Sequence, residues 1–185
     1  MDRNEILRKM AHLCAPLFAL AYLIPDDLGM VSRDVLAVVL WLIFASIEVY
    51  RIRCGKEFPG LRPYESERPS AAFQMCTAFL IMIIFFPVEY ALPLLLGFGI
   101  TDPLIGILRK KGSKLYPAVP LLVYFIIMSA SLSVFFEFSF RTIAISLIVT
   151  ISAISIESYR NRIVDDDFLM IFVPLMVLWI LDSIV

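Results

Sequence analysis

Seven apolar runs, separated by loops that carry most of the charge, constrain the fold of this chain more than any other feature. The runs cover residues 11–24, 35–49, 71–86, 90–108, 116–136, 142–156 and 168–184. A helix needs about 20 residues to cross a hydrocarbon core of about 30 Å, so several runs are short on length alone. Because 61% of the 185 residues are hydrophobic and only 18% are charged, an ordinary soluble domain or a disordered chain is excluded. We expect one all-α, polytopic membrane domain over residues 1–185.

The distribution of Lys and Arg predicts the number of spans and their orientation. Fourteen of the sixteen fall in the N-terminal segment and in the loops after the second, fourth and sixth runs, while Arg33 and Arg141 fall on the other side. The N-terminal segment and the loop after the second run share one face only if an even number of spans lies between them, which supports both short initial runs as helices that cross the bilayer. By the positive-inside rule the basic face is cytoplasmic. We therefore predict about seven transmembrane helices with a cytoplasmic N-terminus, in the cell membrane or, in a eukaryote, the endoplasmic reticulum.

Other features narrow the class of protein. The formal charge of -1 gives no basic field for nucleic acid, so no nucleic-acid partner is expected. The three cysteines lack metal-ligand spacing and are interpreted as packing residues. The first run resembles a signal peptide in length, but it ends in Pro25, Asp26 and Asp27 without a small-residue cleavage site, and we expect it to be retained.

A first group of polar residues lies at the N-terminus. Glu5, Arg8, Lys9 and His12 are spaced i, i+3, i+4 and i+7, which places an acid, two cations and an imidazole on one face of a helix. A snorkelling, positive-inside anchor accounts equally well for the charged members. His12 favours a site, because the only histidine lies inside an apolar run.

Asp102 forms the second feature, within the segment from Gly97 to Gly106. In a helix it would lie about 10 Å below the basic loop. An unpaired carboxylate there costs about 2.5 kcal/mol or more, so it needs a partner or a wet cavity. Two preceding glycines and Pro103 predict a weakened helix, in which Asp102 could N-cap a short second half-helix. Broken helices in membranes usually line a site.

The loop after the fourth run contains four cations in six residues and a glycine, which suits phosphate oxygens but equally a headgroup-facing loop. Its cations are Arg109, Lys110, Lys111 and Lys114. The P-loop spacing is absent.

The last group follows the sixth run, where Glu157 precedes three consecutive aspartates, Asp165, Asp166 and Asp167. Carboxylates of this kind hold a hard cation such as Mg²⁺. A solvated acidic cap at the start of a helix is the alternative. All four groups lie on the predicted cytoplasmic face, where they supply metal ligands and phosphate-binding cations beside an apolar bundle. This combination is typical of phosphoryl or nucleotidyl transfer to a lipid.

The chain resembles the CTP-dependent polyprenol kinase family, which includes dolichol and phytol kinases and is distantly similar to phosphatidate cytidylyltransferases. Its N-terminal group matches the family's Glu-x-x-Arg-Lys-x-x-His opening. Further matches, in order, are Arg62 and Pro63, Glu67 to Ala71, Asp102 with Gly106, Arg109 and Gly112, Ile156 and Glu157, Asp165 to Asp167, and Pro174 with Leu175. Two features depart from the family. The Lys-x-x-Glu-Gly-Ser segment associated with nucleotide binding is absent, and Asp167 replaces the Asn of Asp-Asp-Asn, with Pro174 farther downstream than usual.

The resemblance implies a membrane-embedded kinase that transfers the γ-phosphoryl group of CTP, with Mg²⁺, to the hydroxyl of an isoprenoid alcohol. Implied catalytic residues are Asp102, His12 and Glu157; implied metal ligands are Asp102, Asp166 and Asp167. Implied phosphate-binding residues are Arg8, Lys9, Arg109, Lys110, Lys111 and Lys114.

Two other functions stay open. A cytidylyltransferase would use the same groups to make a CDP-activated lipid and release pyrophosphate. A non-catalytic relative, such as a transporter or scaffold, would use the charges for topology and helix pairing. Close packing of Glu5, Arg8 and His12 against Asp102 and Glu157 would favour one site, and wide separation would favour independent anchors.

Overall fold

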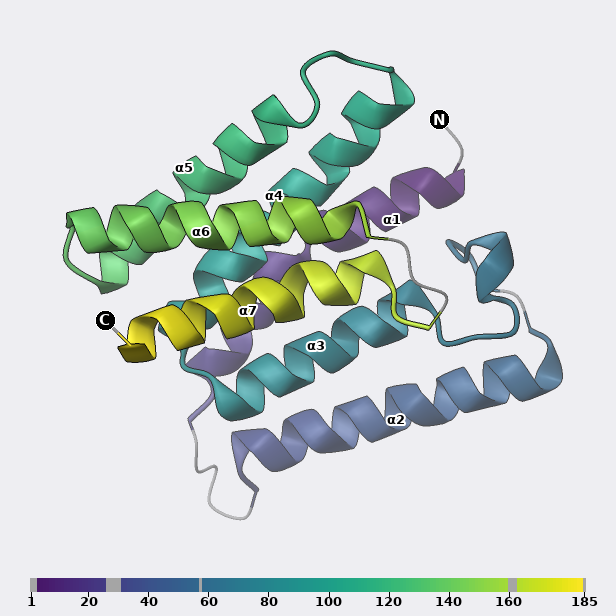
Figure 1. Cartoon of the computed structure of the whole chain (residues 1–185). Helices are drawn as coiled ribbons and strands as arrows, with labels where there is room; N and C mark the ends of the chain where they lie inside the picture. Colours follow the sequence, from purple (N-terminus) through teal and green to yellow (C-terminus); the bar gives the residue numbers. More distant parts are fainter. Residues whose placement is uncertain (1–2, 26–30, 57, 160–162, 185) are drawn as a thin grey trace.

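A computed structural model describes residues 3–25, 31–56, 58–159 and 163–184, and within these ranges the chain is helical and has no strand (Figure 1). The α-helices are α1 (Arg3–Leu13), α2 (Arg33–Cys54), α3 (Ala71–Phe85), α4 (Val88–Lys110), α5 (Ala118–Phe135), α6 (Phe140–Glu157) and α7 (Asp166–Ile184). Two 3₁₀ helices, η1 (Ala15–Leu23) and η2 (Pro63–Glu65), complete the described elements.

Serine side chains define where three of the α-helices begin. The hydroxyls of Ser32, Ser70 and Ser139 each accept a hydrogen bond of 3.2 Å from the amide three residues later, at the starts of α2, α3 and α6. Each satisfies an amide that would otherwise be orphaned in the first turn. At the other end of α2, Gly55 adopts a φ of 60°, a left-handed conformation that glycine reaches at low cost.

The length and composition of these helices confirm the all-α membrane fold. Six described helical segments are long and apolar enough to cross a bilayer: Asn4–Leu23, which joins α1 and η1, and the helices α2, α4, α5, α6 and α7. The apolar α3 has 15 residues and is shorter. Together they agree with about seven spans, although the first begins well before residue 11. Arg160 and Arg162, which we counted on the basic face, lie outside the described residues.

The helices pack around α4, which contacts the first span, α3, α5 and α7. Figure 1 shows α7 lying between α6 and α3, with α2 at the outer edge of the bundle against α3. Fully buried Leu94 and Phe98 of α4 meet Met128 of α5, Val149 of α6 and Ile171 of α7 in one core. The ends of the helices lie on two opposite faces of this bundle (Figure 1). We call the one with the N-terminus and the loops after α2, α4 and α6 the basic face.

The interruption expected near Asp102 lies instead in the first span. α4 continues from Val88 to Lys110 with Pro103 inside it, so the prediction that Asp102 caps a second half-helix is wrong. The first span changes from α-helix to 3₁₀ helix between Leu13 and Ala15, with a proline in the first turn of η1. Proline lacks the amide that would continue the α-helical hydrogen bonds, which accounts for a break at this point.

Two of the three glycines of α4, Gly97 and Gly99, serve packing. A Cβ built on Gly97 would lie 2.8 Å from the ring of Tyr124, and one on Gly99 would lie 2.8 Å from the carbonyl oxygen of His12 and 2.9 Å from the ring of Pro16. Only a residue without a side chain allows α5 and the break in the first span to approach α4 so closely. The same glycines that predicted a broken helix thus support a continuous one.

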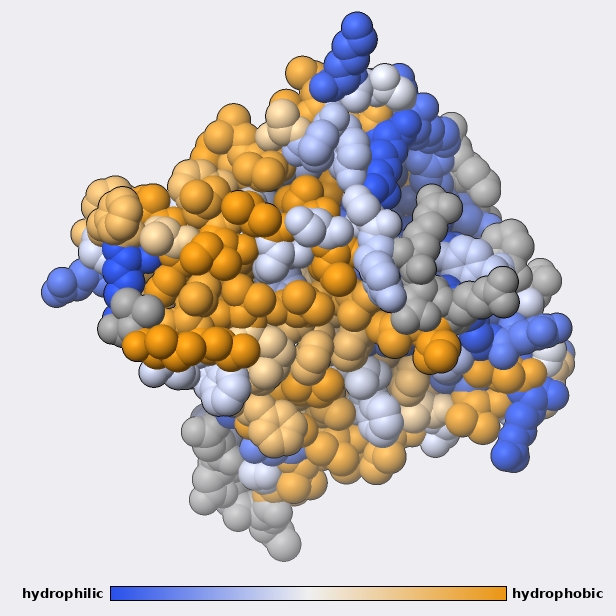
Figure 2. All heavy atoms as spheres, viewed as in Figure 1, coloured by the Kyte–Doolittle hydropathy of each residue, from blue (hydrophilic) through white to orange (hydrophobic). Residues whose placement is uncertain are grey.

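The surface agrees with a membrane protein that has two polar ends. Figure 2 shows hydrophobic side chains across the middle of the visible face and hydrophilic ones gathered towards its ends, most of them at the end where α1 begins. Large apolar side chains stay exposed there and elsewhere, among them Leu23, Val134 and Ile184, each at least 76% exposed. Such exposure suits contact with lipid.

Thiol labelling tests the predicted orientation. Cys14 and Cys54 are exposed and Cys76 is half-buried, so the packing interpretation of the first two is wrong. In a Cys14→Ser/Cys76→Ser background, we expect Cys54, on the basic face, to react with an impermeant maleimide only after the membrane is permeabilised. A cysteine introduced by Phe138→Cys, on the opposite face, should react in intact cells. The reverse pattern would invert the orientation, and reaction of both from one side would contradict the alternation of spans.

Candidate functional site

A polar pocket of about 410 Å³ opens on the basic face, a volume typical of small-molecule sites. Its walls come from α1, α4, the end of α6 and the start of α7, with Arg62 contributed by the loop before α3. Glu5, Arg8, His12, Asp102 and Glu157 all line this one pocket. By the criterion stated above, this arrangement favours one site over independent anchors.

His12 lies at the centre of the pocket's charged groups. Its Nδ1 donates a hydrogen bond of 2.6 Å to the carbonyl oxygen of Arg8. Its Nε2 lies 3.4 Å from Oδ2 of Asp102 and 3.2 Å from Oδ1 of Asp167. The imidazole thus joins residues of α1, α4 and α7, and its side chain is only 8% exposed.

Local structure explains this convergence. His12 occupies the last turn of α1, where the close approach at Gly99 presses the break in the first span against α4. Asp102 follows Gly99 by one turn on the same helix. Asp167 lies in the first turn of α7, where the positive end of the helix dipole stabilises a carboxylate. Its amide donates to Oδ1 of Asp165 at 3.3 Å, which fixes the start of α7.

The charges in this cluster allow two arrangements, one with a protonated imidazole and one with a bound cation. Because Nδ1 donates to a carbonyl, Nε2 directs either a lone pair or a second proton towards two carboxylates. A second proton would pair directly with the two carboxylates, whereas a lone pair facing them would be repulsive unless a cation lay between them. Nε2 and one oxygen each of Asp102 and Asp167 lie within 4.8 Å of one another, close enough to share one ion.

The ligand set fits a divalent ion. Carboxylate oxygens are the ligands of Mg²⁺, as expected from the sequence, and an imidazole nitrogen extends the choice to Mn²⁺ and other transition metals. Asp166 belongs to a second group of possible ligands, formed with Asp165 and Asp167. His12, interpreted from the sequence as a catalytic residue, is therefore placed among the candidate metal ligands, and Asp167 belongs to both groups.

Cations form the outer wall of the pocket, and acids hold several of them. Glu5 accepts hydrogen bonds from Lys9 at 2.8 Å and from Lys110 at 2.6 Å, and so connects α1 with α4. Arg109 donates to Oε1 of Glu157 at 2.6 Å, which engages the carboxylate that we had interpreted as catalytic. Three basic side chains of two helices thus lie on one rim, in a position to contact phosphate oxygens.

The loop between α2 and α3 brings two further arginines to the aspartates, a contribution that the sequence did not predict. Arg62 Nη1 lies 3.4 Å from Asp165 and 3.3 Å from Asp166, and Arg68 Nη2 lies 3.3 Å from Asp165. Burial, followed by the negative charge of Asp167, raises the pKa of Asp165 to about 7, and the charge of Arg62 opposes this shift. For Arg62, burial lowers the pKa, but the surrounding aspartates outweigh it and raise the pKa overall.

A buried ion pair holds this loop in place. Arg51 is fully buried and donates to both oxygens of Glu48, at 3.0 and 2.9 Å, and to the carbonyl oxygen of Arg68 at 2.7 Å. Glu48 also accepts from the amide of Ser70, the first residue before α3. The sequence signal was present, since a Glu and an Arg three residues apart occupy the end of an apolar run.

The remaining predicted residues differ in position. Asp166 lines the pocket, as do Lys9, Arg109 and Lys110. Lys111 and Lys114 are exposed in the loop after α4 and do not line it, so the structure does not place them with the other phosphate-binding candidates. Both residues follow the end of α4, which lies at Lys110.

Comparisons with protein-family models, curated proteins and solved structures found no significant match to this chain.

Replacing Arg51 tests the buried pair. We expect Arg51→Met to leave Glu48 as an uncompensated buried charge, which costs about 3 kcal/mol and lowers the melting temperature in detergent by roughly 10 °C. Arg53→Met is the matched control, because Arg53 is exposed two residues later on the same helix. Equal melting temperatures for the two variants would contradict the role of Arg51 in holding the loop.

Binding of Mn²⁺ tests the cation site. Titration of the purified protein, with free Mn²⁺ followed by electron paramagnetic resonance, should reveal one tight site. We expect Asp167→Asn to weaken it by at least about 10-fold, because one ligand is lost. Asp34→Asn removes a carboxylate on the opposite face and should leave binding unchanged. The absence of binding to the unmodified chain, or equal affinity in both variants, would refute the site.

Proposed function

We propose that this chain is an integral membrane transferase that moves the γ-phosphoryl group of a nucleoside triphosphate to the hydroxyl of a lipid alcohol. By resemblance, the donor is CTP and the acceptor an isoprenoid alcohol. The observation that carries the proposal is a His-Asp-Asp cluster, of which His12 and Asp102 line the same pocket as a rim of Lys and Arg. Phosphoryl transfer needs both, since catalysis consists mainly of positioning and of neutralising charge on phosphate oxygens.

The position of the pocket supports a lipid acceptor. Asp102 lies eight residues before the end of an apolar α4, and His12 lies inside the first span. At 1.5 Å per residue Asp102 is about 12 Å from the end of its helix. The hydroxyl of a lipid held in the membrane can reach groups at this depth, while the rim of the same pocket stays open to the phosphates of the donor.

The residues have distinct proposed roles. His12, Asp102 and Asp167 would hold a divalent ion, which when bound would supply positive charge to the phosphate oxygens. Arg8, Lys9 and Lys110 would bind the phosphates of the donor. Arg109 would keep Glu157 in place through their 2.6 Å contact.

The proposed reaction moves the γ-phosphoryl group from the nucleotide to the oxygen of the alcohol. The hydroxyl oxygen of the alcohol attacks the γ-phosphorus, and the bond from that phosphorus to the β–γ bridging oxygen breaks. The hydroxyl proton passes to a carboxylate, for which Asp166 is the candidate because it lines the pocket with its side chain 30% exposed. The nucleoside diphosphate leaves with the bridging oxygen, and the products are a lipid monophosphate and, for a CTP donor, CDP.

Transfer of label from nucleotide to lipid tests the proposal. Purified protein in liposomes receives Mg²⁺ or Mn²⁺, a panel of prenols, and CTP or ATP labelled at the α- or γ-phosphorus. We expect γ-label to enter the lipid from CTP. The rate should fall roughly 100-fold in Asp102→Asn, because the ion that would compensate transition-state charge loses a ligand. Asp34→Asn should retain the rate.

Each other outcome has a meaning. Entry of α-label into a CDP-lipid would identify a cytidylyltransferase and refute the kinase. Failure of both labels to enter, with protein that melts cooperatively, would favour the non-catalytic relative suggested by the missing Lys-x-x-Glu-Gly-Ser segment. Unchanged transfer in Asp102→Asn would remove the central residue of the proposed site.

A further inference from the structure

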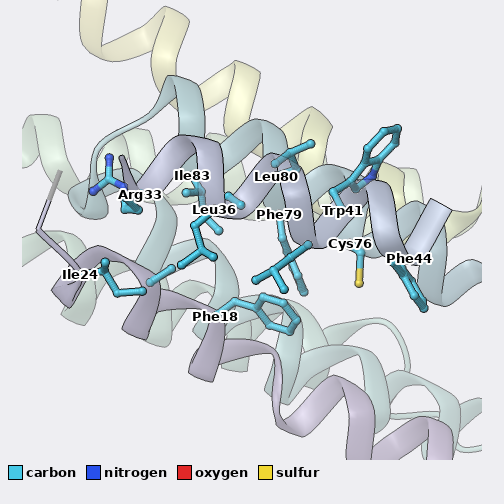
Figure 3. Close-up of a pocket in the computed structure, with 13 residues that line it drawn as sticks. Phe18, Ile24, Arg33, Leu36, Trp41, Phe44, Cys76, Phe79, Leu80 and Ile83 are labelled. Carbon is cyan, nitrogen blue, oxygen red and sulfur yellow. The ribbon is translucent and has the colours of Figure 1, made fainter. Parts of the chain in front are cut away.

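An apolar groove lies between the first span and α2, away from the polar pocket (Figure 3). Phe18, Ala21 and Ile24 form one wall, α2 forms the other, and Phe79 and Ile83 of α3 form the floor. The gap arises because α2 and η1 both pack against α3. The cavity volume is about 210 Å³.

The 3₁₀ conformation of η1 builds the wall of this groove. With three residues per turn, side chains three apart lie in straight rows. The row Phe18, Ala21, Ile24 lines the groove, and Ala19 and Tyr22 pack against the core. The third row, Leu17, Leu20 and Leu23, is 55 to 78% exposed. In an α-helix these rows would rotate by about 60° at each step of three and leave the groove.

The walls restrict what can occupy the groove. Its lining comes from membrane-spanning segments and from α3. Among the described residues that line it, Arg33, at the end on the face opposite the polar pocket, is the one with a charge. The volume lies below the 300 to 1,000 Å³ of sites for compact ligands, so the groove suits one chain better than a folded molecule. Within a bilayer, the occupant that meets these conditions is the hydrocarbon chain of a lipid.

The first span contributes residues to both the groove and the polar pocket. His12 lines the pocket and Phe18, six residues later, lines the groove. The rises of α- and 3₁₀ helices place these residues about 11 Å apart along the span, and Ile24 about 12 Å farther. A lipid whose hydroxyl lies in the pocket therefore extends its chain to the depth in the membrane at which the groove lies.

We propose that this groove binds the hydrocarbon chain of the lipid alcohol whose hydroxyl is placed in the polar pocket. The identity of that lipid rests on the function proposed above. The chain must extend beyond about 11 Å to enter the groove, so the site distinguishes long alcohols from short ones. Because lipid tails surround the protein, the preference comes from packing against the walls and not from removal of the chain from water.

Filling the groove tests the proposal through substrate choice. Ala37 lines the groove on α2, whereas Val39, two residues later, is 45% exposed and does not line it. We expect Ala37→Trp to lower phosphorylation of geranylgeraniol at least about 10-fold relative to dimethylallyl alcohol, which is too short to reach the groove. Val39→Trp is the matched control and should preserve the ratio. Equal losses for both alcohols in Ala37→Trp would overturn the proposal.

Photocrosslinking provides a readout that needs neither catalysis nor a variant. Nucleotide-free protein in liposomes is irradiated with geranylgeraniol carrying a diazirine at the far end of its chain, and the modified peptides are identified by mass spectrometry. We expect crosslinks on η1, α2 and α3 that excess geranylgeraniol suppresses and excess phospholipid does not. Crosslinks elsewhere, or equal suppression by phospholipid, would refute the proposal.

The two proposals fail separately. Crosslinks confined to the groove without any transfer of label would support the chain site and count against the kinase. Transfer of label with crosslinks outside the groove would support the kinase and refute the chain site.

Discussion

The contact of His12 with Asp102 and Asp167 is the interaction on which the rest of the site depends. The three residues come from α1, α4 and α7, and their charged groups meet inside a bundle of apolar helices. Ionised groups at such depth are stable only when they are paired, hydrogen-bonded or bound to a cation. Each charged group is satisfied only while the three helices stay packed together. The charges and the helix packing therefore stabilise each other.

The surrounding charges extend this principle outward. Arg62 and Arg68 face the aspartates at the start of α7, while the buried pair of Glu48 and Arg51 fixes the loop that carries them. Removing one member of a buried pair leaves the other as an uncompensated buried charge, which destabilises the fold. Such pairs therefore favour a single arrangement even where they add little net stability. The loop that closes one side of the pocket is held by this pair and by the pairing of its arginines with the aspartates.

The sequence predicted the helical class, the alternation of faces and the need of Asp102 for a partner. It did not identify that partner, because the pairing of residues 90 positions apart depends on which helix faces pack together. Gly97, Gly99 and Pro103 were compatible with a broken α4 and with a continuous one. Tyr124 and Pro16 decide between them by occupying the space beside the glycines. Arg62 and Arg68 were seen in the sequence, but no spacing rule connects a loop to aspartates about 100 residues later.

The conformation of the first span links the two proposed sites. Its α-helical part rises about 1.5 Å per residue and brings His12 against α4 at the level of Asp102. Its 3₁₀ part rises about 2.0 Å per residue, so η1 gains roughly 4 Å over an α-helix of equal length. The first span has 20 residues, from Asn4 to Leu23, and its first turns carry polar side chains. The extra length of η1 helps the apolar remainder to cross a core of about 30 Å. The same tightening aligns Phe18, Ala21 and Ile24, so the break at Pro16 that serves the polar pocket also shapes the groove.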